Sequence, residues 1–142
     1  MVELLGRERA DRSFRFRELI ESGAVFSLGS DWPASASLST YRTLDEIEIA
    51  HTRQALGASG GPVLPPADER LGLEQIIEAA TLNRAIQMGL ENRIGSIEVG
   101  KFADLIVLDK NLFAVEPNDI HKTKLLFTMM NGGVTHRAPD FE

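Results

Sequence analysis

The sequence predicts a mixed α/β fold, and the order of two kinds of pattern carries that prediction. An amphipathic helix pattern over residues 8–22 is followed at once by a nearly continuous apolar segment at 24–29. Such a segment is typical of a strand that is covered on both faces, as in a parallel sheet. The last third of the chain instead alternates short strand patterns with turn residues. We therefore expect two parts, residues 1–91 and residues 92–142.

Helix periodicity and end signals define the elements of the first part. Thr43 with Glu46 three residues later forms a capping-box pattern at a helix start. The small residues at 34–40 and the glycines and prolines at 57–67 predict loops. The sequence thus predicts helices at 8–22, 44–56, 73–80 and 82–89.

The second part is predicted to be a small β unit. Asn131-Gly132-Gly133 between two apolar runs is a hairpin signal. Residues 95–100 are a strand fragment or a turn. The expected strands of this part span 103–109, 125–131 and 133–137.

The composition excludes several classes of protein. The chain has 142 residues, 43% of them hydrophobic and 25% charged, as in ordinary globular domains. Its net charge of -6 argues against a nucleic-acid partner, because the phosphate backbone requires a basic surface. Cysteine is absent, which excludes disulfides and thiolate metal sites. No apolar run could span a bilayer or form a signal-peptide core, so we expect no membrane partner and a cytoplasmic location.

The candidate functional residue is Asp31, within Gly29-Ser30-Asp31-Trp32-Pro33. It lies just past the carboxyl end of the predicted strand 24–29, where catalytic groups gather in parallel α/β folds. A carboxylate there can bind a divalent cation or take a proton from metal-bound water. On these residues alone, an Asx turn or a hydrogen-bonded loop carboxylate is the alternative.

The three histidines carry weaker signals. His51 lies within the predicted helix 44–56 without ligand-type residues four positions before or after it, so a packed or hydrogen-bonded histidine is favoured over a metal ligand. His121 and His136 belong to the β unit, and both are predicted to be surface histidines.

Five runs of residues carry a family resemblance: Leu5-Gly6-Arg7-Glu8-Arg9-Ala10, Phe16-Arg17-Glu18-Leu19-Ile20, Gly29-Ser30-Asp31-Trp32-Pro33, Ala79-Ala80-Thr81-Leu82-Asn83-Arg84-Ala85 and 95–109. As a set, spanning residues 5–137, they resemble the C-terminal part of amidohydrolase family 3. This group includes N-substituted formamide deformylases.

The resemblance implies a hydrolase with a (β/α)₈ barrel that cleaves carbon–nitrogen bonds of small amide-type substrates through metal-activated water. Residues 1–91 would be the last helix–strand–helix units of the barrel, and residues 92–142 the closing strands of an accessory β domain. Asp31 matches the family position that binds the metal, zinc by expectation, and accepts the proton of the attacking water. Asp104 falls in the accessory segment, where a structural role is expected.

The family's remaining ligands have no match in this sequence. A barrel of this type needs about 250 residues, and the family's His-x-His pair is absent. We therefore expect the chain to begin after the seventh barrel strand, to be inactive alone and to hold no tight metal. It should form a homo-oligomer or associate with the missing barrel part.

The residues leave two other functions to consider. A truncated, non-catalytic module for oligomerisation or binding is the principal alternative. A nucleotide-binding α/β module is disfavoured, because no further phosphate-binding glycines follow Gly29.

Overall fold

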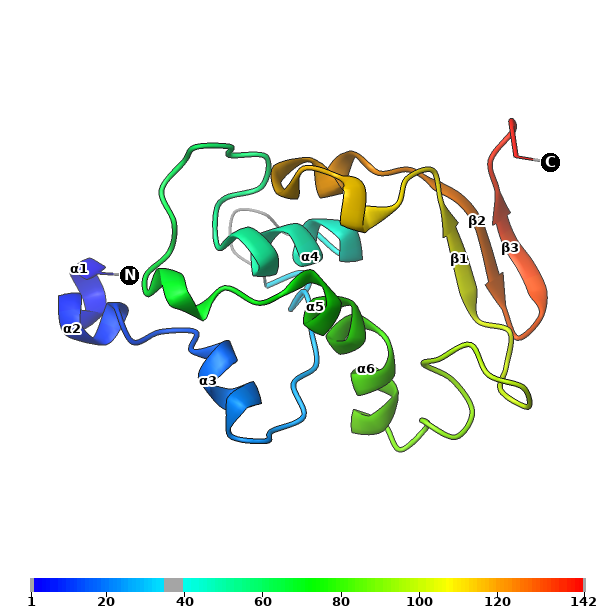
Figure 1. The fold of residues 1–142 in the computed structure, drawn as a ribbon, viewed down its shortest axis with the longest axis horizontal. Helices are drawn as coiled ribbons and strands as arrows, with labels where there is room; N and C mark the ends of the chain where they lie inside the picture. The colour runs from blue at the N-terminus through cyan, green and yellow to red at the C-terminus, as the bar shows by residue number, and fades with distance from the viewer. Residues whose placement is uncertain (1, 35–39, 142) are drawn as a thin grey trace.

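The computed structural model describes residues 2–34 and 40–141. Helices make up the first part, and a three-stranded antiparallel sheet lies at the opposite end of the molecule (Figure 1). Most of the small-residue run at 34–40, predicted as a loop, lies outside the described residues. The helices are α1 Val2–Leu5, α2 Arg7–Ala10, α3 Phe16–Glu21, α4 Thr43–Thr52, α5 Leu73–Ala80 and α6 Leu82–Gln87, with 3₁₀ helices η1 Ala67–Glu69, η2 Leu112–Ala114 and η3 Pro117–Lys122.

The prediction of one helix over 8–22 is wrong. The chain forms α2 and α3 there, and the break contains Phe14 with φ 56°. A bulky residue in this left-handed region cannot continue a right-handed helix. The Phe14 carbonyl instead accepts a hydrogen bond from Arg53 Nη1 at 2.8 Å. A contact distant in sequence therefore stabilises the break.

Helix α4 begins near the predicted position but ends earlier than Gly57. Arg53 follows Thr52 with φ 52°, which ends the helix. The predicted capping box is also wrong, because Arg42 occupies the N-cap and makes no side-chain capping bond. The Glu46 carboxylate lies 2.9 Å from Arg84 Nη2 instead.

Residues 24–29 do not form the predicted strand in this chain. They belong to no helix and to no sheet, and the sheet of the described residues contains only β1, β2 and β3. Of the main-chain N–H groups between Val25 and Ser30, only that of Leu28 donates elsewhere in the described chain, to Ala79 O at 3.1 Å. A strand needs neighbours that complete its hydrogen-bond ladder. This segment lacks them among the described residues.

Helices α5 and α6 and the β unit match the prediction closely. Strands β1 Leu105–Leu108, β2 Leu125–Met130 and β3 Gly133–Arg137 pair in the order β1-β2-β3. The hairpin turn has positive φ at both Asn131 and Gly132, as a type I′ turn requires. Residues 95–100 contain a bend and a turn and no strand. Asp104 Oδ1 accepts the Asn131 N–H at 2.6 Å, which is the structural role expected of it.

The core lies where α4 packs against α5 and η3. It consists of the buried side chains Ile47, Leu71, Ile76, Leu112 and Ile120. Phe26 and Leu28 of the unpaired segment pack against this cluster from outside. Within the described part of the chain, no helix is long and apolar enough to cross a membrane.

Candidate functional site

Asp31 lies on a tight turn at the end of the segment that enters from Phe26. Its main chain has φ 55°, and its carbonyl accepts the Ala34 N–H at 2.7 Å. The intervening Trp32–Pro33 peptide bond is cis. The Asp31 residue is exposed, and its carboxylate has no hydrogen bond or ion pair among the described residues. It is thus free to meet a ligand that approaches from solvent.

Two aromatic residues flank this turn. Trp32 contacts Tyr41 edge to face, with ring centroids 6.1 Å apart and an interplanar angle of 83°. Both rings are largely exposed, 57% for Trp32 and 74% for Tyr41. The main-chain N–H of Trp32 donates to the Ser30 hydroxyl at 3.3 Å. The pair therefore places an exposed apolar surface next to Asp31.

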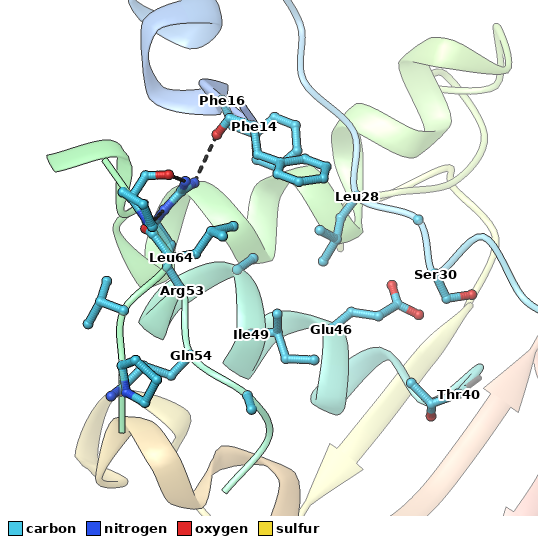
Figure 2. A pocket seen from close by; sticks show the side chains of 16 residues that line it. Phe14, Phe16, Leu28, Ser30, Thr40, Glu46, Ile49, Arg53, Gln54 and Leu64 are labelled. Carbon is cyan, nitrogen blue, oxygen red and sulfur yellow. Dashed lines mark hydrogen bonds between the residues drawn. The ribbon is translucent and has the colours of Figure 1, made fainter. Parts of the chain in front are cut away.

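An open pocket of about 690 Å³ lies beside the segment. Figure 2 shows Ser30 and Thr40 at one end of it and Arg53 and Gln54 at the other, with the rings of Phe14 and Phe16 above. Its lining is mostly apolar: Phe14, Phe16, Leu28, Gly29, Ser30, Thr40, Glu46, Ile49, Ala50, Arg53, Gln54, Ala55, Pro62, Val63, Leu64 and Pro65.

Glu46 is the carboxylate of this pocket. Its side chain is 8% exposed and lies 2.9 Å from Arg84 Nη2. Burial raises the pKa of Glu46 above its ordinary value, and the attraction of Arg84 and its hydrogen bond to the carboxylate offset part of that shift. A second hollow of about 350 Å³ continues from Ser30 and Glu46 toward Tyr41, Arg84 and Gln87.

Side chains of α6 hold the segment that leads to Asp31. Asn83 Nδ2 donates to Phe26 O at 3.0 Å, and Arg84 Nε donates to Leu28 O at 2.6 Å. Sequence analysis found neither Glu46 nor Arg84 as a site residue. The available signal was the polar pair Asn83-Arg84 within a helix that also carries Leu82, Ala85 and Ile86. Nothing in the sequence linked this pair to residues 26–28.

At the C-terminal end of α4, the Arg53 guanidinium joins three segments. It is 6% exposed and donates to the carbonyls of Phe14, Leu64 and Pro65 at 2.8–3.0 Å. Burial lowers the pKa of Arg53 from its ordinary value, and the nearby acids Glu69 and Asp68 oppose that effect. The residue thus forms one end of the pocket and fixes two loops against the helix.

The histidines lie apart from this arrangement. His51 Nδ1 lies 2.8 Å from the carbonyl oxygen of Leu71, so the prediction of a hydrogen-bonded histidine is confirmed. His136 is exposed on β3. His121 lies only partly at the surface: its side chain is 21% exposed, and its Nδ1 lies 2.6 Å from the fully buried carboxylate of Glu48. Glu48 also accepts the main-chain N–H groups of Gly57 and His121.

The described residues do not complete a metal centre. No group of three or more His, Asp or Glu side chains among them is arranged to hold a metal ion. A zinc site requires three or four protein ligands. Asp31 could supply one exposed carboxylate, and the carboxylates of Glu46 and Glu48 already have partners.

Comparisons with known proteins place these observations in context. The sequence profile of the amidohydrolase family matches residues 1–136. The chain is 34% identical over 107 residues to the 5-methylthioadenosine/S-adenosylhomocysteine deaminase of Moorella thermoacetica, covering 73% of this chain and 22% of that protein. It is 29% identical over 119 residues to the N-substituted formamide deformylase of Arthrobacter pascens, covering 84% and 20%. The chain therefore spans about a fifth of the length of these relatives.

A solved structure shares the fold. The crystal structure of an amidohydrolase from Thermotoga maritima MSB8 matches 86% of this chain and 25% of its own, with a TM-score of 0.60 and 24% identity. The arrangement of helices and sheet described above thus recurs as part of a larger protein.

Proposed function

The chain belongs to the amidohydrolase family, and we propose that it forms the C-terminal portion of a metal-dependent enzyme that hydrolyses carbon–nitrogen bonds. Residues 1–91 would close a (β/α)₈ barrel, and residues 92–142 would complete an accessory β domain. The observation that carries this proposal is the placement of Asp31. It is an exposed carboxylate without a partner in the described chain, on a turn just beyond an apolar segment, and it directly follows Ser30, which lines a pocket.

Asp31 is the residue to which we assign the chemistry. A carboxylate can accept the proton that water loses as it attacks the carbon of a carbon–nitrogen bond. General-base catalysis of this kind typically contributes 10²–10⁴-fold, as an order-of-magnitude range. Because no other group of the described chain holds the Asp31 carboxylate, its oxygens stay available for water and ligands.

The metal of such an enzyme would require ligands beyond those described here. A bound zinc ion would lower the pKa of its water to about 7. Asp31 would be one of its ligands, and the others would come from the remaining part of the enzyme. The described residues do not complete that site.

The substrate is proposed to be a small amide-type molecule. Both relatives named above, a deaminase and a deformylase, have names that refer to removing a group across a carbon–nitrogen bond. The exposed rings of Trp32 and Tyr41 beside Asp31 offer apolar contact to such a substrate. We place the enzyme in the cytoplasm.

A non-catalytic role in oligomerisation or binding is the second candidate. It is favoured by the segment 24–29, whose main chain is largely unpaired in the described residues. Unpaired strand-like segments recruit other strands. The same feature fits a barrel strand whose neighbours come from the rest of the enzyme, so activity must separate the two functions.

The test compares Asp31→Asn with Asp140→Asn in the polypeptide that carries this sequence, purified from its native source. Asp140 is exposed and lies near the other end of the chain, so the control removes the same charge. Hydrolysis of an N-substituted formamide and deamination of 5-methylthioadenosine are assayed with added zinc. We expect Asp31→Asn to lose at least about 10²-fold in kcat while it stays folded. Equal activity of the two variants would refute the role of Asp31.

A further inference from the structure

Side chains of helix α6 make hydrogen bonds to the segment before Asp31, which has no neighbouring strand among the described residues. Asn83, Arg84 and Gln87 lie on one side of the helix, because Gln87 comes four positions after Asn83 and three after Arg84. Asn83 donates to Phe26 O and Arg84 to Leu28 O, at 3.0 and 2.6 Å. The Ser27 hydroxyl donates to Gln87 Oε1 at 2.5 Å. Three consecutive residues of the segment are therefore bound to one helix.

Arg84 is the member of this set that is itself held in place. While its Nε binds the Leu28 carbonyl, its Nη2 lies 2.9 Å from Glu46 Oε2. Glu46 and Ser30 line the same two hollows beside the segment. The planar guanidinium thus bridges a carbonyl and a carboxylate in a fixed geometry, which a lysine cannot reproduce. The contacts form a chain, Leu28–Arg84–Glu46, that holds the main chain three residues before Asp31.

Asp31 has no comparable restraint of its own. Its carboxylate makes no hydrogen bond or ion pair among the described residues, and the segment before it has one main-chain hydrogen bond beyond Ala24. The position of the carboxylate therefore depends on where Leu28, Gly29 and Ser30 are fixed.

We propose that Arg84, with Glu46 as its counter-ion, is a positioning residue for Asp31. It fixes the carbonyl of Leu28, so that the turn carrying the carboxylate begins at a defined place. The catalytic consequence rests on the proposed function of Asp31, whereas the positional claim can be tested in residues 1–142 alone. A misplacement of about 1 Å at a reacting group can lower a rate on the order of 10²-fold.

The positional claim is tested with Trp32, the only tryptophan of the chain. Trp32 follows Asp31, so acrylamide quenching and anisotropy of its fluorescence report on this turn. We expect Arg84→Met to raise the quenching constant and lower the anisotropy, with Arg84→Lys intermediate. The matched control is Arg93→Met, which removes an exposed arginine that contacts the Phe102 ring at 4.7 Å. This control should leave both signals at the wild-type value.

Global unfolding is separated from local release by circular dichroism and by a second variant. Glu46→Gln keeps Arg84 but removes its charged partner, and it should change the Trp32 signals in the same direction as Arg84→Met. If circular dichroism shows that Arg84→Met has lost helix content, the Trp32 signals of Glu46→Gln are used to test the proposal instead. Unchanged Trp32 signals in a folded Arg84→Met or, failing that, in Glu46→Gln would overturn the proposal, whatever the function of Asp31.

The catalytic consequence is read in the native polypeptide with the assays described for Asp31. Arg84→Met should lose on the order of 10²-fold in kcat with a smaller change in KM, and Arg84→Lys should recover part of it. If Trp32 is released but kcat is retained, Arg84 does not position a reacting group. If Asp31→Asn is itself fully active, the proposed function fails, and only the structural contact of Arg84 remains.

Discussion

Two carboxylates separated by fifteen positions have opposite surroundings in this protein. Asp31 is exposed and has no partner among the described residues, whereas the Glu46 side chain is 8% exposed and pairs with Arg84. A carboxylate that water and ligands reach can act in chemistry, and one that is buried and paired is suited to holding structure. We therefore assign the reaction to Asp31 and the support of its turn to Glu46.

The raised pKa of Glu46 predicts a pH dependence of stability. Burial is the largest cause of the shift from the ordinary value of 4.5. Because the folded protein holds this proton more tightly than the unfolded chain, the stability contribution of Glu46 is complete below its ordinary pKa. It is lost as the pH rises through the raised pKa of the folded state.

Urea unfolding from about pH 4 to about pH 7 should reveal this difference. The unfolding free energy of wild type should fall with rising pH relative to that of Glu46→Gln, which has no proton to lose. Glu74→Gln serves as the control, since Glu74 is exposed on α5. If the unfolding free energies of wild type and Glu46→Gln change in parallel with pH, the burial of Glu46 makes no contribution to the pH dependence of stability.

At the scale of elements, the end of α4 depends on a single guanidinium. Arg53 is in the left-handed region and donates to the carbonyls of Phe14, Leu64 and Pro65. These bonds fix the break between α2 and α3 and the loop after α4. The residue therefore links the three segments that border one end of the pocket.

Replacing Arg53 with methionine should destabilise the protein markedly. The substitution keeps much of the apolar side chain but removes the charged donor of four carbonyls, those of Ser13, Phe14, Leu64 and Pro65. A hydrogen bond to a charged group contributes about 1.5–3 kcal/mol. We expect the unfolding free energy to fall by at least about 2 kcal/mol in urea titrations. Arg12→Met, at an exposed arginine, should change it by less than about 0.5 kcal/mol. A similar small change in Arg53→Met would contradict this role.

The elements that the sequence predicted well are those specified locally. Helix α5 follows from the spacing of Leu73, Ile76 and Ile77, and the β2–β3 hairpin follows from Asn131-Gly132. The break at Phe14 could not be predicted in this way, because it depends on Arg53, which lies 39 positions away. The strand at 24–29 was inferred from its apolar character, but pairing requires neighbours that the described chain does not provide.

In the candidate site, too, the sequence predicts the residue that is specified locally and misses those that depend on tertiary contacts. Asp31 could be found because it directly follows an apolar segment and belongs to a run of residues that resembles a family motif. Glu46 and Arg84 could not, because their role arises from a contact between α4 and α6, 38 positions apart. Glu46 was instead interpreted as part of a capping box, which is what its spacing from Thr43 favours in the absence of tertiary contacts.

At the scale of the whole molecule, the unpaired segment predicts association. Val25 is 61% exposed, and the main-chain N–H groups on either side of Phe26 have no partners among the described residues. Such a segment can add a strand from another chain. Residues 1–142 expressed alone should therefore form dimers or larger assemblies at micromolar concentration.

Light scattering checks this expectation. Val25→Lys places a charge on the unpaired segment and should shift the population toward single chains. Val99→Lys is the control, because Val99 is fully exposed in a turn of the 95–100 region. The mass of one chain for the wild-type protein, or equal assembly of both variants, would rule out association through residues 24–29.

The most direct test of the central claim is the distance between Asp31 and the metal in the intact enzyme. The native polypeptide that carries this sequence would be crystallised with zinc, and the ion located from its anomalous scattering. We predict a carboxylate oxygen of Asp31 within about 2.0–2.2 Å of the metal. An active, zinc-loaded enzyme in which Asp31 faces solvent away from the ion would contradict the account.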